Sequence, residues 1–596
     1  MTARFAVGID LGTTNNVLAY TPLDLDEPSV QVLPIPQLVA AATIEARPQL
    51  PSFAYLASPH EAGQGTFDLP WASGRDFAVG ELARRQSAEV PDRTVGGAKS
   101  WLCHGRVDRR GQILPWNAPA EVSKISPLTA TERYLEHLVS AWLHAFPDAP
   151  LADQHVVLTV PASFDAAARE LTREAALAAG LPDHLLLLEE PQSAVYAWVA
   201  QIGNRWRRLM KLNDILLVCD VGGGTTDFTL VQVGEENGEL ILQRIAVGNH
   251  LLVGGDNMDL ALAYQASQMF ANKNVHLDPW QSVSLWHSCR AAKETMLAEN
   301  GPGTYTLSVL GRGSKLIGGT VSVEIKRKMV SDLLVEGFFP HGPIDQRPAR
   351  QRASGFQDIG LPFEQDTAIT RHLAAFLQDH GSGSQSGAVR PTHLLLNGGV
   401  FKASVLANRL SEVLADWAGG QVPQRLEGEQ DLDNAVARGA AYYGWAKHRG
   451  GVRIRGGTAR AYYVGIETAG LAIPGAPRPL RALCVAPLGM EEGDQADVPS
   501  GEIGLVVGQP AHFRFFSSSV RKQDQVGDVL PSWTSDELAE TDSLEATLEP
   551  DQTIEEHYVP VKFQSRVTEL GMFELWCVST TSDKRWKLEF SVREED

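Results

Sequence analysis

The hydrophobic pattern of the first 450 residues is that of alternating strands and helices. Apolar runs typical of buried strands begin the stretches 5–20 and 215–230, and a further buried strand is expected in HVVLTVPASF, which begins at His155. Apolar residues three and four positions apart predict helices over about 129–146, 166–179 and 256–298, a helix that follows Gly399 and runs to about Trp417, and a helix over 435–448. Thr129 and Glu132 form a capping box for the first of these. A further helix is expected to begin near Ser193, so the order of elements indicates a mixed α/β architecture.

From Ala461 onward the pattern changes to a period of two. Over 561–568 and over 586–593, apolar residues alternate with polar ones. Strands with one apolar and one polar face are typical of antiparallel sheets, here packed as a sandwich. The sequence therefore predicts an α/β part over 1–448, a linker over 449–460 and a separate β-rich domain over 461–596.

Two stretches of the α/β part are near-copies of each other. FAVGIDLGTTNNVLAY begins at Phe5 and ILLVCDVGGGTTDFTL begins at Ile215. In each, an apolar strand is followed by an Asp, a Gly-rich turn that closes on Thr-Thr, and a second apolar run. Such a hairpin suits a phosphate, because glycines let backbone N–H groups approach an anion and the Asp can hold a hydrated metal beside it. Two copies suggest two lobes that face each other across one nucleotide.

Composition narrows the class of protein. A chain of 596 residues is expected to fold as at least two domains. A formal net charge of −20, without a basic stripe, argues against a nucleic-acid surface. No export leader, no apolar run of membrane-spanning length and five scattered cysteines indicate a cytoplasmic protein with reduced thiols and no membrane partner.

One phosphate-loop lookalike is rejected. Residues 96–100, Gly-Gly-Ala-Lys-Ser, have Ala98 where a P-loop needs glycine before its lysine, and polar residues precede them where a P-loop follows a strand. No G-x-G-x-x-G opens a helix after a strand either, which disfavours a dinucleotide enzyme.

The remaining motifs occur in a familiar order. GIDLGTTN, VPASFDAAAR, EEPQSAV, DVGGGTTDF, VGGDNMD and NGGVFKA together resemble the nucleotide-binding domain of the heat-shock protein 70 (DnaK-type) chaperones. The chain thus resembles an atypical bacterial member of the actin, sugar-kinase and chaperone ATPase superfamily. The resemblance runs from residue 5 to about residue 447. It implies an actin-like ATPase with two duplicated ribonuclease-H-like lobes, followed by a β-sandwich-like domain that binds polypeptide.

The resemblance also implies a role for individual residues. Lys99 would reach the γ-phosphate, Glu190 and Thr225 would place the attacking water, and Asp10, Asp220 and Glu190 would hold Mg²⁺, the two aspartates through its waters. K⁺ is a further candidate ion. Residues implied to bind ATP or ADP are Gly12, Thr13, Thr14, Asn15, Gly222, Gly223, Gly224, Thr225, Gly254, Gly255, Lys293, Gly398, Gly399, Lys402 and Asp433. Pro161 and Arg169 match the switch that reports nucleotide state to the second domain.

The sequence departs from the family pattern in three places. In the helix CRAAKETML, Arg290 stands for a usual Glu and Glu294 for a frequent Arg, so the phosphate end is expected to be better kept than the base end. The joint at 449–457 is basic and Gly-rich where the family has an acidic-leucine linker, so docking through apolar side chains is not expected. The last strand pair is followed directly by Asp596, which predicts a peptide clamp without a helical lid.

The sequence therefore favours a chaperone ATPase that hydrolyses MgATP slowly and couples nucleotide state to polypeptide binding, with J-domain and nucleotide-exchange co-chaperones as candidate partners. One alternative is a nucleotide sensor with little turnover that recruits a dedicated protein. Another is a small-molecule kinase of the same superfamily, which is disfavoured because the β-rich domain follows the ATPase part instead of interrupting it.

Overall fold

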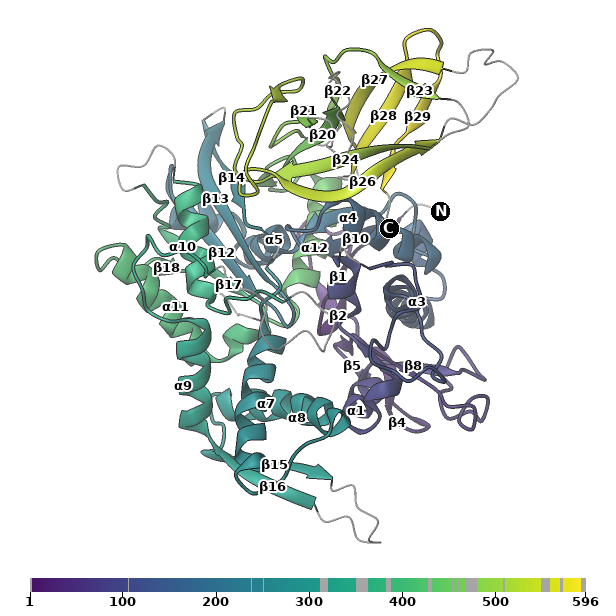
Figure 1. The fold of residues 1–596 in the computed structure, drawn as a ribbon, viewed down its shortest axis with the longest axis vertical. Helices are drawn as coiled ribbons and strands as arrows, with labels where there is room; N and C mark the ends of the chain where they lie inside the picture. Colours follow the sequence, from purple (N-terminus) through teal and green to yellow (C-terminus); the bar gives the residue numbers. More distant parts are fainter. Residues whose placement is uncertain are drawn as a thin grey trace, which may run out of the picture.

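Two mixed sheets with the same strand arrangement form the core of the α/β part (Figure 1). The computed structural model describes residues 3–104, 107–236, 238–249, 251–310, 320–349, 363–381, 387–426, 431–452, 454–458, 460–467, 480–491, 493–506, 510–547, 558–568 and 572–590. In each sheet, the central strand (β1 or β12) continues on one side through two successive parallel pairings. On its other side, two successive antiparallel pairings follow. The near-copies in the sequence therefore correspond to equivalent strand pairs.

The first sheet runs in the order β11-β10-β1-β2-β3, and β6 also pairs with β2. Its strands are β1 (Phe5–Leu11), β2 (Asn15–Pro22), β3 (Gln31–Val32), β6 (Leu50–Pro51), β10 (His155–Val160) and β11 (Leu186–Glu189). Helices α3 (Pro127–Ala145) and α4 (Ala166–Ala178) pack on it, and Leu135, Trp142 and Ala175 are buried against Val7 and Leu158. The apolar runs are thus buried, as their pattern predicted.

The second sheet runs in the order β18-β17-β12-β13-β14-β19. Its strands are β12 (Ile215–Val221), β13 (Thr226–Glu236), β14 (Glu239–Val247), β17 (His393–Asn397), β18 (Gln424–Arg425) and β19 (Ile454–Arg455). The helices of this half are α7 (Gly255–Ala271), α8 (Pro279–Leu297), α9 (Arg327–Phe338), α10 (Ile369–Asp379) and α11 (Ser404–Trp417). Phe228, Met258, Leu285 and Leu373 belong to the apolar core that joins this sheet to its helices.

Helices α5 (Glu190–Ile202) and α12 (Ala435–Arg449) lie between the two sheets (Figure 1). They pack closely because small residues line the contact: a Cβ added at Gly439 would overlap the Ser193 carbonyl. Val199 of α5 and Ala440 of α12 share one buried cluster with Val157 of the first sheet and Val218 of the second. The helix pair is therefore the common wall of both halves.

Shorter elements complete the α/β part. They are β4 (Ile35–Ala40), β5 (Thr43–Arg47), β7 (Phe53–Leu56), β8 (Phe77–Val79), β9 (Thr94–Gly96), β15 (Thr304–Leu310), β16 (Thr320–Lys326), α1 (Glu81–Glu89), α2 (Ala98–Leu102) and α6 (Trp206–Leu209). None of the helices in the described ranges has the length and apolarity that a bilayer crossing requires.

Two antiparallel sheets follow the joint, at the top of Figure 1. One has the order β25-β21-β20-β24-β26-β30 and the other β22-β27-β28-β29, with β23 also paired to β27. The strands are β20 (Ala461–Glu467), β21 (Leu480–Ala486), β22 (Gln495–Asp497), β23 (Ile503–Val506), β24 (Pro510–Ser518), β25 (Val529–Leu530), β26 (Ala539–Thr547), β27 (Tyr558–Val567), β28 (Phe573–Ser579), β29 (Arg585–Lys587) and β30 (Glu589–Phe590). Val464 and Phe515 of the first sheet share a core with Phe563 and Leu575 of the second. The period of two predicted this apolar face correctly.

This β-rich part is packed against the α/β part. Met572 joins the core of the first sheet, and Phe590 packs on Leu102 and Leu171. On the side of the second sheet, the Ser519 hydroxyl donates to the Asn249 side-chain oxygen at 3.3 Å. The joint is also docked, which the sequence did not lead us to expect: Ile454 is buried beside α5 and α12, and β19 pairs in parallel with β14.

Several predicted boundaries were wrong. The cap of α3 is Ser126, whose hydroxyl accepts from the Thr129 N–H at 2.9 Å, and not Thr129. The helix expected over 256–298 is two helices, because Asp278 caps a second one that opens with Pro279. Helix α5 begins at Glu190, three residues before the predicted start, and a short strand, β9, does precede the rejected P-loop lookalike. The objection to that lookalike from Ala98 is unaffected.

Candidate functional site

The turns of the two hairpins face each other at the centre of the α/β part. A Cβ added at Gly223 would overlap the Thr14 hydroxyl, and one added at Gly224 would lie 2.8 Å from both the Thr13 Cγ2 and the Ser100 Oγ. The glycines are therefore needed where the two turns approach. The structure brings Thr13 and Thr14 together with Gly223 and Gly224, all four of which the sequence assigned to phosphate binding.

Each turn is braced by a neighbouring segment. The Ser52 hydroxyl donates to the Gly12 carbonyl at 2.6 Å, and the Ser52 N–H donates to the Thr14 carbonyl at 2.9 Å. Behind the other turn, the N–H groups of Gly255 and Asp256 donate to the carbonyls of Gly222 and Gly223 at 3.0 and 2.7 Å. A Cβ on Gly254 would lie 2.7 Å from those same carbonyls, so this turn also needs glycine.

The remaining turn residues lie at the strand ends. Asn15 begins β2 and Thr225 directly precedes β13. The Thr225 carbonyl accepts from the Gly222 N–H at 2.9 Å, which closes the second turn on itself. Asn15 and Thr225 are both only partly buried.

Two aspartates lie at equivalent positions beneath the turns. Asp10 is the penultimate residue of β1, and Asp220 is the penultimate residue of β12. The Thr159 hydroxyl lies 3.4 Å from Asp10 Oδ1, and the Asn397 side-chain amide donates to Asp220 Oδ2 at 2.7 Å. The carboxyl ends of adjacent strands in each sheet thus position one carboxylate.

Lys99 and Glu190 form a buried ion pair between α2 and α5. Their side chains are only 8% and 13% exposed, and Glu190 is the first residue of its helix. Burial alone would lower the pKa of Lys99, but the carboxylates of Glu190 and Asp10 raise it overall, so the ammonium stays charged. For Glu190, burial raises the pKa against the lowering effect of Lys99.

The cluster carries more acid than base. Burial, and then the charge of Glu190, raise the pKa of Asp10 to about 7 and that of Asp220 to about 8. Lys99 is the counter-charge of Asp10 and Glu190, and Asp220 lies beside them with a raised pKa of its own, an arrangement that a divalent cation would relieve. In the described part of the chain, no three His, Cys, Asp or Glu side chains meet closely enough to ligate a metal directly. Carboxylate oxygens with this shortage of positive charge are of the kind that Mg²⁺ prefers.

Residues predicted for the adenosine end fall into two groups. In the first, Lys293 donates to the Gly255 carbonyl at 2.9 Å and pairs with Asp259 at 2.7 Å. Arg290, on the same helix, pairs with Asp256 and with Asp259, the latter through its Nε at 3.0 Å. The guanidinium is thus engaged by carboxylates directly behind the second hairpin, whereas Glu294 is exposed.

The second group follows β17. A Cβ on Gly398, whose φ is 89°, would overlap the Val221 carbonyl and approach Asp220 Oδ1 at 2.7 Å. A Cβ on Gly399 would meet open space. Lys402 pairs with Asp433, whose carbonyl accepts from the Gln49 side-chain amide at 3.4 Å. Gly398 therefore belongs to the phosphate end, and the pair of Lys402 and Asp433 joins α12 to the segment after β17.

Arg169 of α4 holds the turn that follows β10. Its guanidinium donates to the carbonyls of Ala162 and Phe164 at 3.3 and 3.2 Å, and the Phe164 N–H donates to the Pro161 carbonyl at 3.2 Å. Arg169 also pairs with Glu189 at 3.0 Å. The two residues predicted as a switch are therefore linked in the structure, next to Glu190.

Sequence reasoning missed Thr159, Asn397, Ser52 and Ser100. Asn397 and Thr159 could have been found, because each is a polar residue in a run of strand residues adjacent to a predicted motif. Ser52 and Ser100 carry no such signal, since only the fold brings them to the hairpins.

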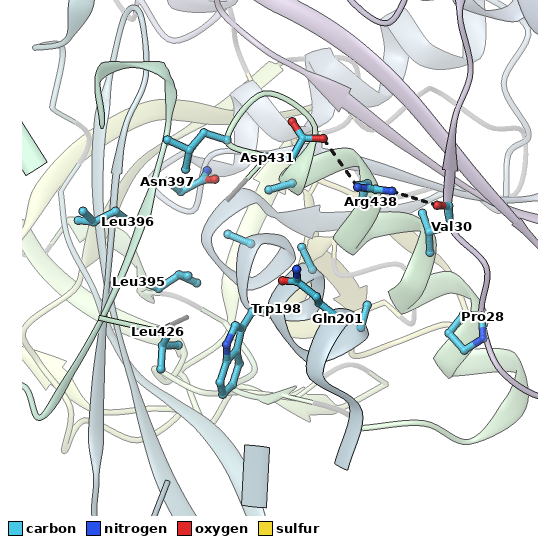
Figure 2. A pocket seen from close by; sticks show the side chains of 15 residues that line it. Pro28, Val30, Trp198, Gln201, Leu395, Leu396, Asn397, Leu426, Asp431 and Arg438 are labelled. Carbon is cyan, nitrogen blue, oxygen red and sulfur yellow. Dashed lines mark hydrogen bonds and ion pairs between the residues drawn. The ribbon is translucent and has the colours of Figure 1, made fainter. Parts of the chain in front are cut away.

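A cavity of about 250 Å³ lies beside the same elements (Figure 2). Its walls come from α5, β17, the start of α12 and the segment around Pro28. Arg438 crosses it to reach Asp431 at 3.7 Å and the Val30 carbonyl at 3.3 Å. Asn397, which bonds Asp220, lines this cavity too, so it shares one wall with the carboxylate cluster.

Comparison with known proteins agrees with the motifs. Residues 71–336 match the family model described as Hsp70 protein. Among curated proteins, the chain is 31% identical over 309 residues to a Chaperone protein HscA homolog of Pseudomonas aeruginosa, covering 50% of this chain and 42% of that protein. It is 29% identical over 294 residues to the Chaperone protein HscA homolog of Pseudomonas fluorescens, covering 49% and 42%.

These matches show that the chain is similar to Hsp70-type chaperones over about half of its length. The alignments span about two fifths of the length of the relatives. The family-model match includes Lys99, Glu190 and the second hairpin, but Asp10, Gly398 and the β-rich part lie outside it.

Proposed function

We propose that this protein is an Hsp70-type chaperone ATPase with an actin-like, two-lobed nucleotide-binding domain. The observation that carries the proposal is the meeting of two Gly-rich turns above Asp10, Asp220, Glu190 and Lys99. Glycine N–H groups and threonine hydroxyls offer donors to a polyphosphate, and the buried ammonium of Lys99 offers the positive charge that phosphoryl transfer needs.

Each residue of the cluster has a role in this proposal. Lys99 neutralises charge that builds on the γ-phosphate, while Glu190, oriented by its pair with Lys99, accepts a hydrogen bond from the attacking water. Thr225 supplies a hydroxyl at the end of the second turn. Asp10, Asp220 and Glu190 would hold Mg²⁺, which when bound neutralises phosphate charge; K⁺ is a second candidate ion.

Domain organisation and partners follow as proposals. The nucleotide-binding domain would comprise residues 1–448, the joint 449–460 and a polypeptide-binding domain 461–596. Supporting observations are the shared core of the two C-terminal sheets and the docked joint. J-domain and nucleotide-exchange proteins are the candidate co-chaperones. The proposed location of the protein is the cytoplasm.

The test is single-turnover hydrolysis of ATP in the presence of Mg²⁺. We expect a slow but measurable rate for the wild type and a loss of at least about a hundredfold in Lys99→Ala, because a buried charge at the reacting phosphate is worth several kcal/mol. The exposed Lys328, 86% accessible, provides the control Lys328→Ala, which should hydrolyse at the wild-type rate. If the wild type and Lys99→Ala bind ATP but hydrolyse it at equal, near-zero rates, the chain is a nucleotide sensor.

A further inference from the structure

Arg244, on β14, lies where the two sheets, the joint and α5 meet. Its side chain is only 3% exposed and pairs with Glu189, the residue before Glu190. The same guanidinium donates to the carbonyl of Gly456 at 3.0 Å and to that of Gly457. One buried cation therefore contacts both the joint and the neighbour of a proposed catalytic residue.

The joint is fitted to Arg244 through its backbone. A Cβ on Gly456 would lie 3.0 Å from the Arg244 Cβ and 3.1 Å from its Nε. Gly457 has φ of 56°, and a Cβ there would overlap the Gly489 carbonyl. Arg244 thus requires a glycine at position 456, and the β-rich part requires one at position 457.

The β-rich part holds the next residue of the joint. The Thr458 N–H donates to the Met490 carbonyl at 2.8 Å, and the Gly489 N–H donates to the Thr458 carbonyl at 2.9 Å. The Thr458 hydroxyl donates to the Pro487 carbonyl at 2.9 Å. A displacement of the turn 487–490 would therefore pull directly on the carbonyls that Arg244 binds.

Glu189 carries the contact into the site. One of its oxygens accepts from Arg169 of α4 at 3.0 Å and the other pairs with Arg244, so arginines from both halves hold it. The Gln192 side-chain amide adds a bond at 3.2 Å. Because Glu189 ends β11 and Glu190 begins α5, fixing Glu189 limits where the carboxylate of Glu190 can lie.

We propose that Arg244 and Glu189 form a latch that holds the joint by its backbone carbonyls and couples the position of the β-rich part to Glu190. Arg244 and Glu189 act as positioning residues and not as catalytic ones. The latch holds the joint through backbone carbonyls, in addition to the packing of Ile454. Its effect on hydrolysis rests on the proposed function, whereas its effect on the joint does not.

The first test measures tryptic cleavage after Arg455 in the full-length protein without nucleotide, with the site verified by mass spectrometry. Cleavage requires the joint to leave the sheet, so its rate reports the undocked population. We expect about tenfold faster cleavage in Arg244→Gln, because charge-assisted hydrogen bonds to two carbonyls are lost. Arg327 also donates to two carbonyls, of Gly301 and Ala298, but far from the joint in the sequence, so Arg327→Gln is the matched control and should be cleaved at the wild-type rate.

Gly456→Ala provides a second variant that leaves the buried charges in place. It should also accelerate cleavage, whereas Gly501→Ala, where a Cβ meets open space, should not. Wild-type cleavage rates in both Arg244→Gln and Gly456→Ala would overturn the proposal. Equal acceleration in Arg244→Gln and Arg327→Gln would overturn it too, because the effect would then be general loosening.

The second test measures single-turnover hydrolysis and nucleotide affinity in Glu189→Gln. We expect hydrolysis about tenfold slower with ATP affinity within about threefold of the wild type, because Glu190 is displaced while the turns are untouched. An unchanged rate, or a loss confined to affinity, would overturn the coupling to Glu190. If the wild type itself does not hydrolyse ATP, the proposed function fails, and the protease test still decides whether the latch holds the joint.

Discussion

Replacing Asp220 with asparagine should stabilise the nucleotide-free protein at neutral pH. Asp220 is buried, and its pKa rises from 3.8 to about 8 in the folded state. Between these values the unfolded chain has released a proton that the folded chain keeps, so stability falls as pH rises through this window. Asparagine has no proton to release and can still accept from Asn397 through its oxygen.

The expected magnitude follows from the same shift. Each pH unit between the two pKa values removes about 1.4 kcal/mol from the stability of the wild type. Asp220→Asn should therefore equal the wild type well below pH 4, exceed it by about 2 kcal/mol at pH 5 and by about 4 kcal/mol at pH 7. The gain should level off above pH 8, where the folded wild type also loses the proton.

Urea unfolding followed by tryptophan fluorescence, in EDTA and without nucleotide, measures this difference at pH 5 and pH 7. The exposed Asp148→Asn is the control and should not change the pH profile. The reasoning is refuted if Asp220→Asn is less stable than the wild type at pH 7, or if the difference is the same at both pH values. A second measurement on Asp220→Asn is its ATP affinity in the presence of Mg²⁺. This affinity should be at least about tenfold weaker than that of the wild type, because a carboxylate proposed to hold the ion is lost.

Three further predictions concern the hairpins and the cation. Gly223→Ala should weaken ATP binding at least about tenfold in a titration with a fluorescent analogue, because the added Cβ would overlap the Thr14 hydroxyl and separate the turns. Gly303→Ala, where the added Cβ meets open space, should bind the analogue with wild-type affinity. The Mg²⁺-dependent part of the ATP affinity, measured by calorimetry, should rise from pH 6 to pH 8.5. Asp10, with a pKa of about 7, and Asp220, with a pKa of about 8, must lose their protons before they hold the ion. A fall in this affinity over the same range would contradict the prediction. Ser52→Ala removes the hydroxyl bond to the Gly12 carbonyl, worth about 1 kcal/mol, and should lower ATP affinity about threefold to fivefold; Ser87→Ala, which loses a bond to the Arg84 carbonyl, should not change it.

The parts of the site that depend on local chain geometry could be predicted from the sequence. Gly223, Gly224 and Gly398 belong to Gly-rich motifs whose residue types indicate the role, although the groups that require glycine there, such as Thr14 and Val221, are brought close by the fold. Ser52 could not be predicted, because it reaches Gly12 only through the pairing of β6 with β2.

The role of Arg244 was hidden for a similar reason. It is one arginine in a strand of alternating pattern, and its partners Glu189 and Gly456 are distant in the sequence. The joint itself was misjudged because apolar side chains were taken as the means of docking. The structure combines backbone pairing of β19 with β14 and packing of Val452 and Ile454 on the cluster that contains α5 and α12.

The two hairpins differ in glycine content because different groups brace them. The first turn is supported by the side chain and backbone of Ser52, which approach from the edge and leave room for Thr13 and Thr14. Behind the second turn lies another backbone turn, whose N–H groups bind the carbonyls of Gly222 and Gly223 directly. Because backbone packs on backbone here, there is no space for a Cβ at Gly254. On its opposite side, the second hairpin turn meets Thr14 at Gly223. The second turn thus has glycine where it meets the first turn, at Gly223 and Gly224, while both turns have an aspartate near the end of the preceding strand.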